Sequence, residues 1–118
     1  MKKFLAIYLG STNDMKMKEW GSLDSETRNQ RTALAMKEWT SWVEKNKDII
    51  VDQGGPIGKT KLMNSAGVTA GKNLITGYTI VLAESNEAAA KLFENHPHFM
   101  IFPGEAVEVM ECLPIPGH

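Results

Sequence analysis

Along this chain, hydrophobic periodicity switches between the pattern of a strand and that of a helix, and the order of the switches allows few folds. Residues 4–9 form a short apolar run with aromatic and branched side chains, which predicts a buried central strand. Segment 15–24 has no clear period and predicts a loop. Thr27 and Gln30 have the spacing of a capping box, so a helix is expected to start there. Its apolar residues recur at intervals of three and four: Ala35, Met36, Trp39, Trp42 and Val43.

The segment after this helix predicts two strands that pair as a hairpin. The apolar stripe continues past a break at 46–47, so the helix is expected to run until the Gly-Gly-Pro segment 54–56 ends it. Strands are then predicted over 57–64 and 74–83. Glycine, serine and asparagine between them favour turns, which indicates a hairpin with a long tip.

The last third of the chain predicts a second helix and a final strand. Ser85 stands at an N-cap position, and the alanine-rich run after it favours a helix that ends at 96–97. A strand over 106–113 follows. The order β-α-β-β-α-β predicts an α+β, ferredoxin-like fold, in which two helices cover one face of a four-stranded antiparallel sheet. With 118 residues, one domain over 1–118 is expected.

The sheet face that the helices leave bare is predicted to be apolar. Removing apolar area from water is favourable by about 25 cal/mol per Å², so such a face favours a cover. A second sheet is the simplest cover, and the sequence therefore predicts a homodimer. Five residues are expected on this face: Leu5, Ile7, Leu9, Val81 and Val109.

Composition excludes several classes of function. The 13 Lys and Arg residues nearly balance the 14 Asp and Glu residues and are scattered, which argues against nucleic acid because that partner requires a concentrated positive face. No stretch approaches the roughly 20 apolar residues that cross a bilayer, so no membrane partner is expected. Cys112 is the single cysteine, which excludes an intrachain disulfide and favours a cytoplasmic protein.

Short matching segments along nearly the whole chain are similar to the YCII-related proteins, including the branch called the DGPF domain. The resemblance implies a dimeric α+β barrel, with two subunits whose sheets meet face to face and a ligand-sized pocket between sheet and helices in each. The matching segments are Phe4-Leu5-Ala6-Ile7-Tyr8, the helix of Trp39 and Trp42, Gly54-Gly55-Pro56-Ile57, Gly77-Tyr78, Ala83-Glu84-Ser85 before Glu87-Ala88, and Val107-Glu108-Val109.

Two departures limit what this resemblance implies. The Asp-Gly-Pro-Phe segment that names the branch is absent, and residues 69–73 stand in its place. Members that resemble lactone isomerases or dehalogenating enzymes use an early histidine and aspartate, whereas this chain has no histidine before His96. Their chemistry therefore does not transfer to this sequence.

His96 and His98 are the candidate catalytic residues. Neutral imidazole serves as a general base or a ligand near pH 7, and two rings separated by one residue can point the same way on an extended segment. The alternative interpretation is a helix end with two partly exposed rings. A metal site would require a third ligand, for which only Glu105 is available; we expect no metal and no cofactor. An acid–base pair of Asp52 with His98 is a further hypothesis.

Four aromatic residues are the candidate substrate-binding residues: Tyr8, Trp39, Trp42 and Tyr78. They can equally be core residues, because the two tryptophans lie on the apolar stripe of the first helix. Two functions follow from these alternatives. One is a dimeric small-molecule enzyme of isomerase or lyase type with a histidine as proton carrier. The other is a non-catalytic module that binds a metabolite or a partner.

Overall fold

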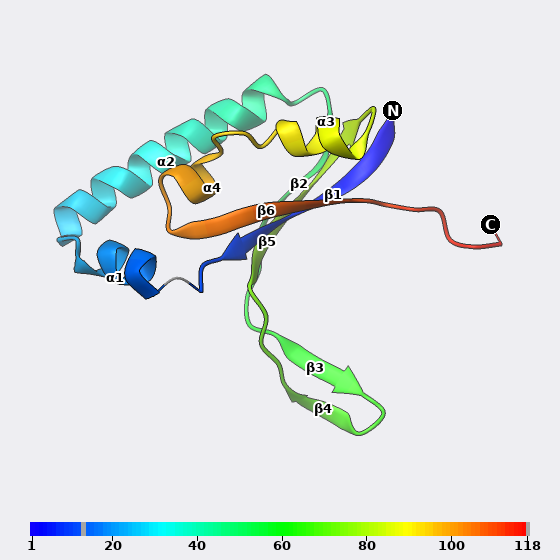
Figure 1. Cartoon of the computed structure of the whole chain (residues 1–118), viewed down its shortest axis with the longest axis horizontal. Helices are drawn as coiled ribbons and strands as arrows, with labels where there is room; N and C mark the ends of the chain where they lie inside the picture. Colours follow the sequence, from blue (N-terminus) through cyan, green and yellow to red (C-terminus); the bar gives the residue numbers. More distant parts are fainter. Residues whose placement is uncertain (13, 118) are drawn as a thin grey trace.

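The structure is a computed structural model that describes residues 1–12 and 14–117. In this part of the chain, four strands form an antiparallel sheet in the order β2-β5-β1-β6 (Figure 1). This order confirms the predicted ferredoxin-like β-α-β-β-α-β arrangement. The strands span Lys2–Gly10 for β1, Ile50–Pro56 for β2, Ile75–Ala83 for β5 and Gly104–Glu111 for β6.

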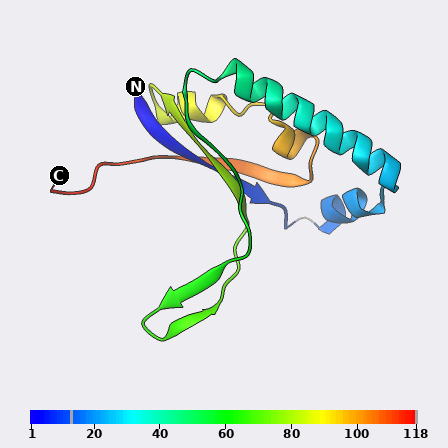
Figure 2. The same ribbon diagram turned by 180° about the vertical axis from the view of Figure 1, so that it is seen from behind.

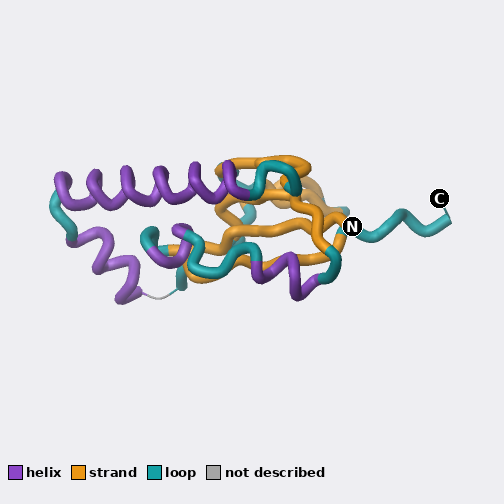
Figure 3. Tube along the Cα trace, turned by 90° about the horizontal axis from the view of Figure 1, so that it is seen from above, coloured by secondary structure: helices purple, strands orange, loops and turns teal. Residues whose placement is uncertain are grey.

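Helices cover one face of this sheet, above the strands in Figure 1, and leave the other face open. Figure 3 looks at the same sheet from the helix side. Two of them, α2 and α3, are the helices that the sequence predicts between strands, and two short helices, α1 and α4, were not predicted. The helices span Asp14–Ser22 for α1, Ser25–Lys45 for α2, Asn86–Lys91 for α3 and Pro97–Met100 for α4.

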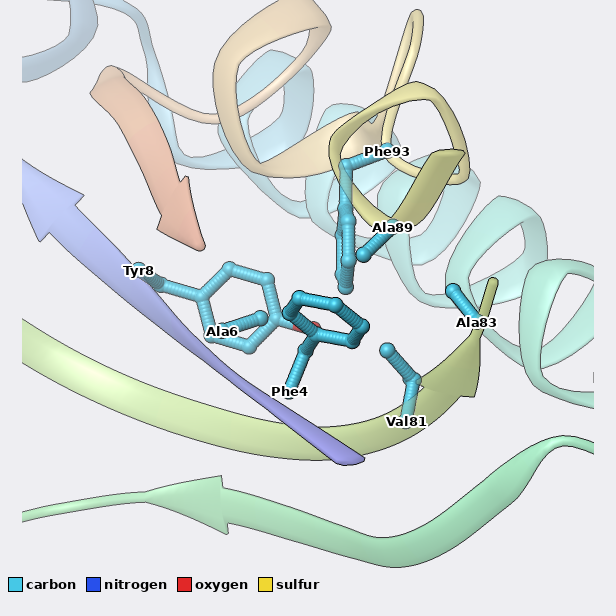
Figure 4. Close-up of a cluster of buried hydrophobic side chains, with 7 residues drawn as sticks. All are labelled: Phe4, Ala6, Tyr8, Val81, Ala83, Ala89 and Phe93. Carbon is cyan, nitrogen blue, oxygen red and sulfur yellow. The ribbon is translucent and has the colours of Figure 1, made fainter. Parts of the chain in front are cut away.

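The core lies between the sheet and the helices (Figure 4). It is built by strand residues that alternate along β1 and β5, together with residues of α3 and the turn after it. Val81 is fully buried in this core, and Val109 pairs with Ala6, which also faces the helices. The prediction that these two valines face the open side is therefore wrong. The buried cluster comprises Phe4, Ala6, Tyr8, Val81, Ala83, Ala89 and Phe93.

The first helical region differs from the sequence prediction at its start. Segment 15–24, predicted as a loop, contains α1; its exposed Met15 and Met17 explain why no apolar stripe marks it. The N-cap of α2 is Asp24 rather than Thr27, because the Asp24 side chain accepts a hydrogen bond of 2.7 Å from the Thr27 amide.

The end of α2 also differs from the prediction. The helix ends at Lys45 rather than at 54–56, and the Asn46 amide caps it by donating to the carbonyls of Trp42 and Val43. Ile50 then pairs with Val81 at the start of β2. The apolar residues after 46–47 thus belong to a strand, whose edge position tolerates the glycines and the proline at 54–56.

Residues 57–74, which we call the arm, extend away from the sheet (Figures 1 and 2). The arm contains a separate two-stranded ribbon, formed by β3 (Lys61–Asn64) and β4 (Gly67–Ala70). The predicted strand at 57–64 is therefore not part of the main sheet. The position beside β5 that was predicted for it is occupied by β2.

The region around the histidines is more regular than predicted. The segment after His96, predicted as a helix end, forms α4, and the last strand begins at Gly104 rather than at residue 106. Within the described ranges, no helix is both long and apolar enough to span a membrane.

Candidate functional site

His96 lies in the turn between α3 and α4 and is 1% exposed. Asn95 precedes it with a φ of 57°, a left-handed conformation that asparagine tolerates better than most residues. This turn reverses the chain after α3 and directs the imidazole inward. His96 is also the N-cap of α4, and Pro97 after it suits the first turn of a helix because its missing amide proton is not needed there.

The hydrogen bonds of His96 determine which nitrogen carries its proton. Nδ1 accepts from the His98 amide at 3.1 Å, so the proton of the neutral ring is on Nε2. Nε2 is buried and has no hydrogen-bond partner among the residues that the structure describes. Burial, with a smaller contribution from His98, lowers the pKa of His96 to about 4. The neutral ring therefore presents an unpaired, buried N–H donor.

His98 is held differently, although it is also buried. Its Nε2 lies 2.6 Å from the carbonyl oxygen of Leu9, and since a carbonyl only accepts, Nε2 carries the proton. Burial lowers the pKa of His98, the main chain of Leu9 opposes this effect, and the charge of Lys16 adds to it. The His98 side chain thus ties α4 to the end of β1.

The backbone of β6 passes directly against the His98 ring. A Cβ atom added at Gly104 would overlap the His98 ring and its carbonyl oxygen, so this position requires glycine. The Gly104 carbonyl accepts a hydrogen bond of 2.6 Å from Lys16 Nζ, which connects α1 to the same point. Close backbone approach and this bond together fix the position of His98.

Aromatic rings surround His96 from three elements. Its ring centroid lies 4.4 Å from that of Trp39, 5.1 Å from Trp42 and 5.7 Å from Phe93. Tyr8 on β1 lies 5.3 Å from both histidine rings. The tryptophans come from successive turns of α2, and Trp42 is anchored by an indole N–H bond of 2.7 Å to the Leu92 carbonyl.

A chain of hydrogen bonds orients the Tyr8 hydroxyl. Thr79 Oγ1 donates its only proton to the Gln53 carbonyl at 3.0 Å, so Tyr8 donates to Thr79 at 2.8 Å. Burial raises the pKa of Tyr8 to about 12, and the bond to Thr79 only partly opposes this. Tyr8 is thus a neutral phenol at all ordinary pH values, with lone pairs that remain able to accept.

The structure brings together most of the predicted site residues but not all of them. Tyr8, Trp39 and Trp42 surround the two histidines, whereas Tyr78 follows Gly77 and precedes Thr79 on β5 and points to the open face. Tyr78 donates a hydrogen bond of 3.1 Å to Asp52 on that face, and this bond raises the pKa of the Tyr78 hydroxyl. The predicted Asp52–His98 pair is therefore wrong, because the sheet separates the two side chains.

Sequence reasoning also missed three residues of this site. Phe93 was read only as part of a helix, although its place three residues before His96 puts both on one side of the turn. Thr79 was read only as a strand residue. The role of Asn95 could have been suspected, because asparagine before His-Pro favours a turn with positive φ.

The surface has a hollow beside this site and another at a distance from it. One of about 320 Å³ lies between α3, α4 and β6 and is lined in part by Phe93, Phe99 and Ala106. The ring of Phe93 also contacts that of His96. The other, of about 350 Å³, lies at the base of the arm, away from the histidines. Within residues 1–12 and 14–117, no three His, Cys, Asp or Glu side chains converge as metal ligands would.

Fold and site together define an α+β protein with buried imidazoles between an antiparallel sheet and its helices. A similar fold occurs in the solved structure of 5-chloro-2-hydroxyhydroquinone dehydrochlorinase from Burkholderia phenoliruptrix, in complex with 2,5-dihydroxybenzoquinone. The similarity covers 92% of this chain and 90% of that chain, with a TM-score of 0.50 and 18% sequence identity.

Searches of family models and of curated proteins find no match to the sequence. The structural likeness supports the predicted fold. Because no family model matches, membership of the YCII-related family stays a prediction.

Proposed function

We propose that this protein is a small-molecule enzyme of isomerase or lyase type, in which the Nε2–H group of His96 binds an oxygen atom of the substrate. The observation that carries this proposal is the buried Nε2 of His96, which finds no partner in the described structure. A buried donor without a partner costs roughly 1–3 kcal/mol, and a bound oxygen acceptor removes that cost.

The state of His96 determines the chemistry it can perform. Because its pKa is about 4, the ring is neutral near pH 7 and acts as a hydrogen-bond donor. A neutral donor in a dry site stabilises the negative charge that develops on a carbonyl oxygen when a water molecule that enters with the substrate takes a proton from the adjacent carbon. His96 itself does not take this proton, because its Nδ1 accepts from the His98 amide. Isomerisations and eliminations on carbonyl or quinone substrates require this stabilisation of negative charge on oxygen.

The aromatic rings around His96 would suit a planar, conjugated substrate once they move apart to admit it. Rings of Trp39, Phe93 and Tyr8 would stack on or meet the edge of such a molecule. The hollow lined by Phe93 is the route of entry in this proposal, and the Phe93 ring, which contacts both the hollow and His96, would move aside to admit the substrate. His98 is a positioning residue in this proposal, since its Nε2 proton is engaged by Leu9.

Binding of 2,5-dihydroxybenzoquinone, the compound bound by the dehydrochlorinase of similar fold, is a suitable first test. His96→Gln places an amide N–H where Nε2 was, whereas His96→Asn keeps only the capping acceptor at the position of Nδ1. Titration calorimetry should give a Kd for His96→Gln close to that of the parent protein and a Kd about tenfold weaker for His96→Asn. Equal affinities for the two variants would contradict the role of Nε2.

A non-catalytic binding module is the second candidate, and the close packing of the rings around His96 favours it. Proton exchange distinguishes the two functions. An enzyme of the proposed type should incorporate deuterium from D2O into a bound carbonyl compound that has an acidic C–H group, as followed by NMR. Binding without exchange across a panel of such compounds would support the module.

The proposal includes a homodimer in which two copies cover the open faces of their sheets. Leu5, Ile7 and Leu9 alternate with the buried residues of β1 and point to this face, where they are only half-buried. Ile80 and Leu82 on β5 extend the same apolar surface. A second copy covers it without exposing a new apolar face, because the contact is symmetric.

A further inference from the structure

The arm is the part of the molecule that packs against neither the main sheet nor the helices. It projects from the sheet on the side opposite the helices (Figures 1 and 2). A two-stranded ribbon is marginal in water by itself, and three strands or a packing partner are normally required. The ribbon β3–β4 is therefore expected to pack against something outside its own subunit.

The side chains of the ribbon support this expectation. Met63 pairs directly with Val68 across the two strands, so both lie on one face of the ribbon. They are 70% and 64% exposed, and Leu62 on the other face is 48% exposed. Two adjacent apolar residues at the tip of a protruding ribbon form a surface that favours a partner.

The exposed surface area of the molecule indicates how large a contact with a partner would be. The chain exposes 8368 Å², while a compact monomer of its 13.1 kDa would expose about 6,400 Å². Its radius of gyration of 16.4 Å likewise exceeds the roughly 13.5 Å of a compact chain of this length. The excess of about 2,000 Å², to which the arm and the extended C-terminal tail both contribute (Figure 1), lies in the range that each copy contributes to an obligate dimer with a large interface.

Charges on the arm and on the open face are complementary. Residues 57–74 contain Lys59, Lys61 and Lys72 and no Asp or Glu. On the open face, the edge strands β6 and β2 carry Glu108, which pairs with Ile7, and Asp52, which pairs with Ile80. An arm reaching across a second copy would bring its lysines to one of these acidic edges. Complementary charges of this kind fix the register of an interface.

From these observations we propose that the arm is an intersubunit clasp, whose Met63–Val68 face packs on a second copy of this chain at the rim of the open sheet face. The inference rests on the dimer of the proposed function. Two-fold symmetry then lets each arm hold the other subunit, so the clasp is made twice.

The test compares two charge substitutions on opposite faces of the ribbon. Val68→Glu puts a carboxylate on the apolar face, and Thr69→Glu puts the same charge on the other face. Sedimentation equilibrium should give a dimer dissociation constant at least about tenfold higher than the parent's for Val68→Glu, and a parent-like constant for Thr69→Glu. A parent-like constant for Val68→Glu would overturn the inference.

Cross-linking provides a direct second measurement. A benzophenone amino acid at position 63, in a mixture of isotopically light and heavy protein, should give cross-links between copies that map to the open face or to β6. Cross-links only within one chain would overturn the clasp. If Val68→Glu remains dimeric while Ile7→Lys is monomeric, the clasp fails and the pairing of the sheets stands. If the parent protein is monomeric, both fail.

Discussion

His96 is a buried histidine whose surroundings disfavour its charged form, and this makes folding dependent on pH. Its pKa is about 4 in the folded chain and about 6.5 in the unfolded chain. Between these values the unfolded chain binds a proton that the folded chain does not, so stability falls as the pH is lowered. Protonation of this group lowers the free energy of unfolding by about 3 kcal/mol once the pH is below about 4, and it has no effect above a pH of about 6.5.

His96→Asn isolates this contribution, because its side chain can still accept from the His98 amide but does not titrate. Urea unfolding at a series of pH values between 7 and 4 should give a smaller loss of stability for His96→Asn than for the parent. Met36→Asn, which adds the same amide at an exposed position of α2, is the control and should retain the parent's pH dependence. An unchanged dependence in His96→Asn would contradict the buried, neutral state of His96.

Gly104 lies against His98, and this contact supports a prediction about packing. Gly104→Ala should destabilise the protein by about 1–3 kcal/mol, because the new methyl group overlaps the His98 ring and main chain. Chemical denaturation measures the change. Gly58→Ala is the matched control, since a methyl group there meets nothing within 4 Å and should change stability by less than about 0.5 kcal/mol. Similar values for the two variants would contradict the tight contact.

At the scale of single residues, the sequence identified the histidines and aromatic side chains but not their states. Two rings separated by one residue are visible in a sequence, and so are tryptophans on an apolar stripe. The N-cap position of His96 and the bond from His98 to Leu9 depend on Asn95 and on contacts between residues 89 positions apart. Tyr78 was included because its hydroxyl could be offered to a ligand, and only strand pairing decides which face of the sheet it takes.

Helix α3 positions Phe93 and the turn of His96, and its start depends on one side chain. Ser85 Oγ accepts a hydrogen bond of 3.1 Å from the Ala88 amide. Ser85→Ala should lower the free energy of unfolding by about 1 kcal/mol, whereas Ser85→Asp should retain nearly all of it because aspartate also caps helices. Thermal and urea unfolding of both variants measure this. Equal losses in the two variants would show that the cap is not the cause.

At the scale of elements, strong local signals gave correct predictions and weak ones did not. The cap at Ser85, the apolar run of β1 and the alternation in β5 are local and were recognised. The start of β2 was not, because Ile50 continues a helical stripe and becomes a strand residue only by pairing with Val81. Likewise α1 has no apolar period, and its Trp20 contacts Phe102, which is distant in sequence.

For the whole molecule, the open sheet face and the arm point to the same side, and a second copy would cover both. If the protein is a dimer, its melting temperature should rise with protein concentration, because mass action stabilises the associated folded state. Differential scanning calorimetry over a wide concentration range measures this rise. A melting temperature independent of concentration, together with a monomeric mass, would contradict the dimer.

Ile7→Lys tests whether the open sheet face forms the contact between the two copies. Ile7 pairs with Tyr78 on one side and Glu108 on the other, at the centre of the open face. In a monomer a lysine there keeps its charge in water, so the fold should survive, whereas in the dimer the charge would be buried between two sheets without a set partner. Sedimentation should therefore show a folded monomer, with a melting temperature that no longer depends on concentration. Met17→Lys, which adds the same charge at an exposed position of α1, should remain dimeric, and a dimeric Ile7→Lys would place the contact elsewhere.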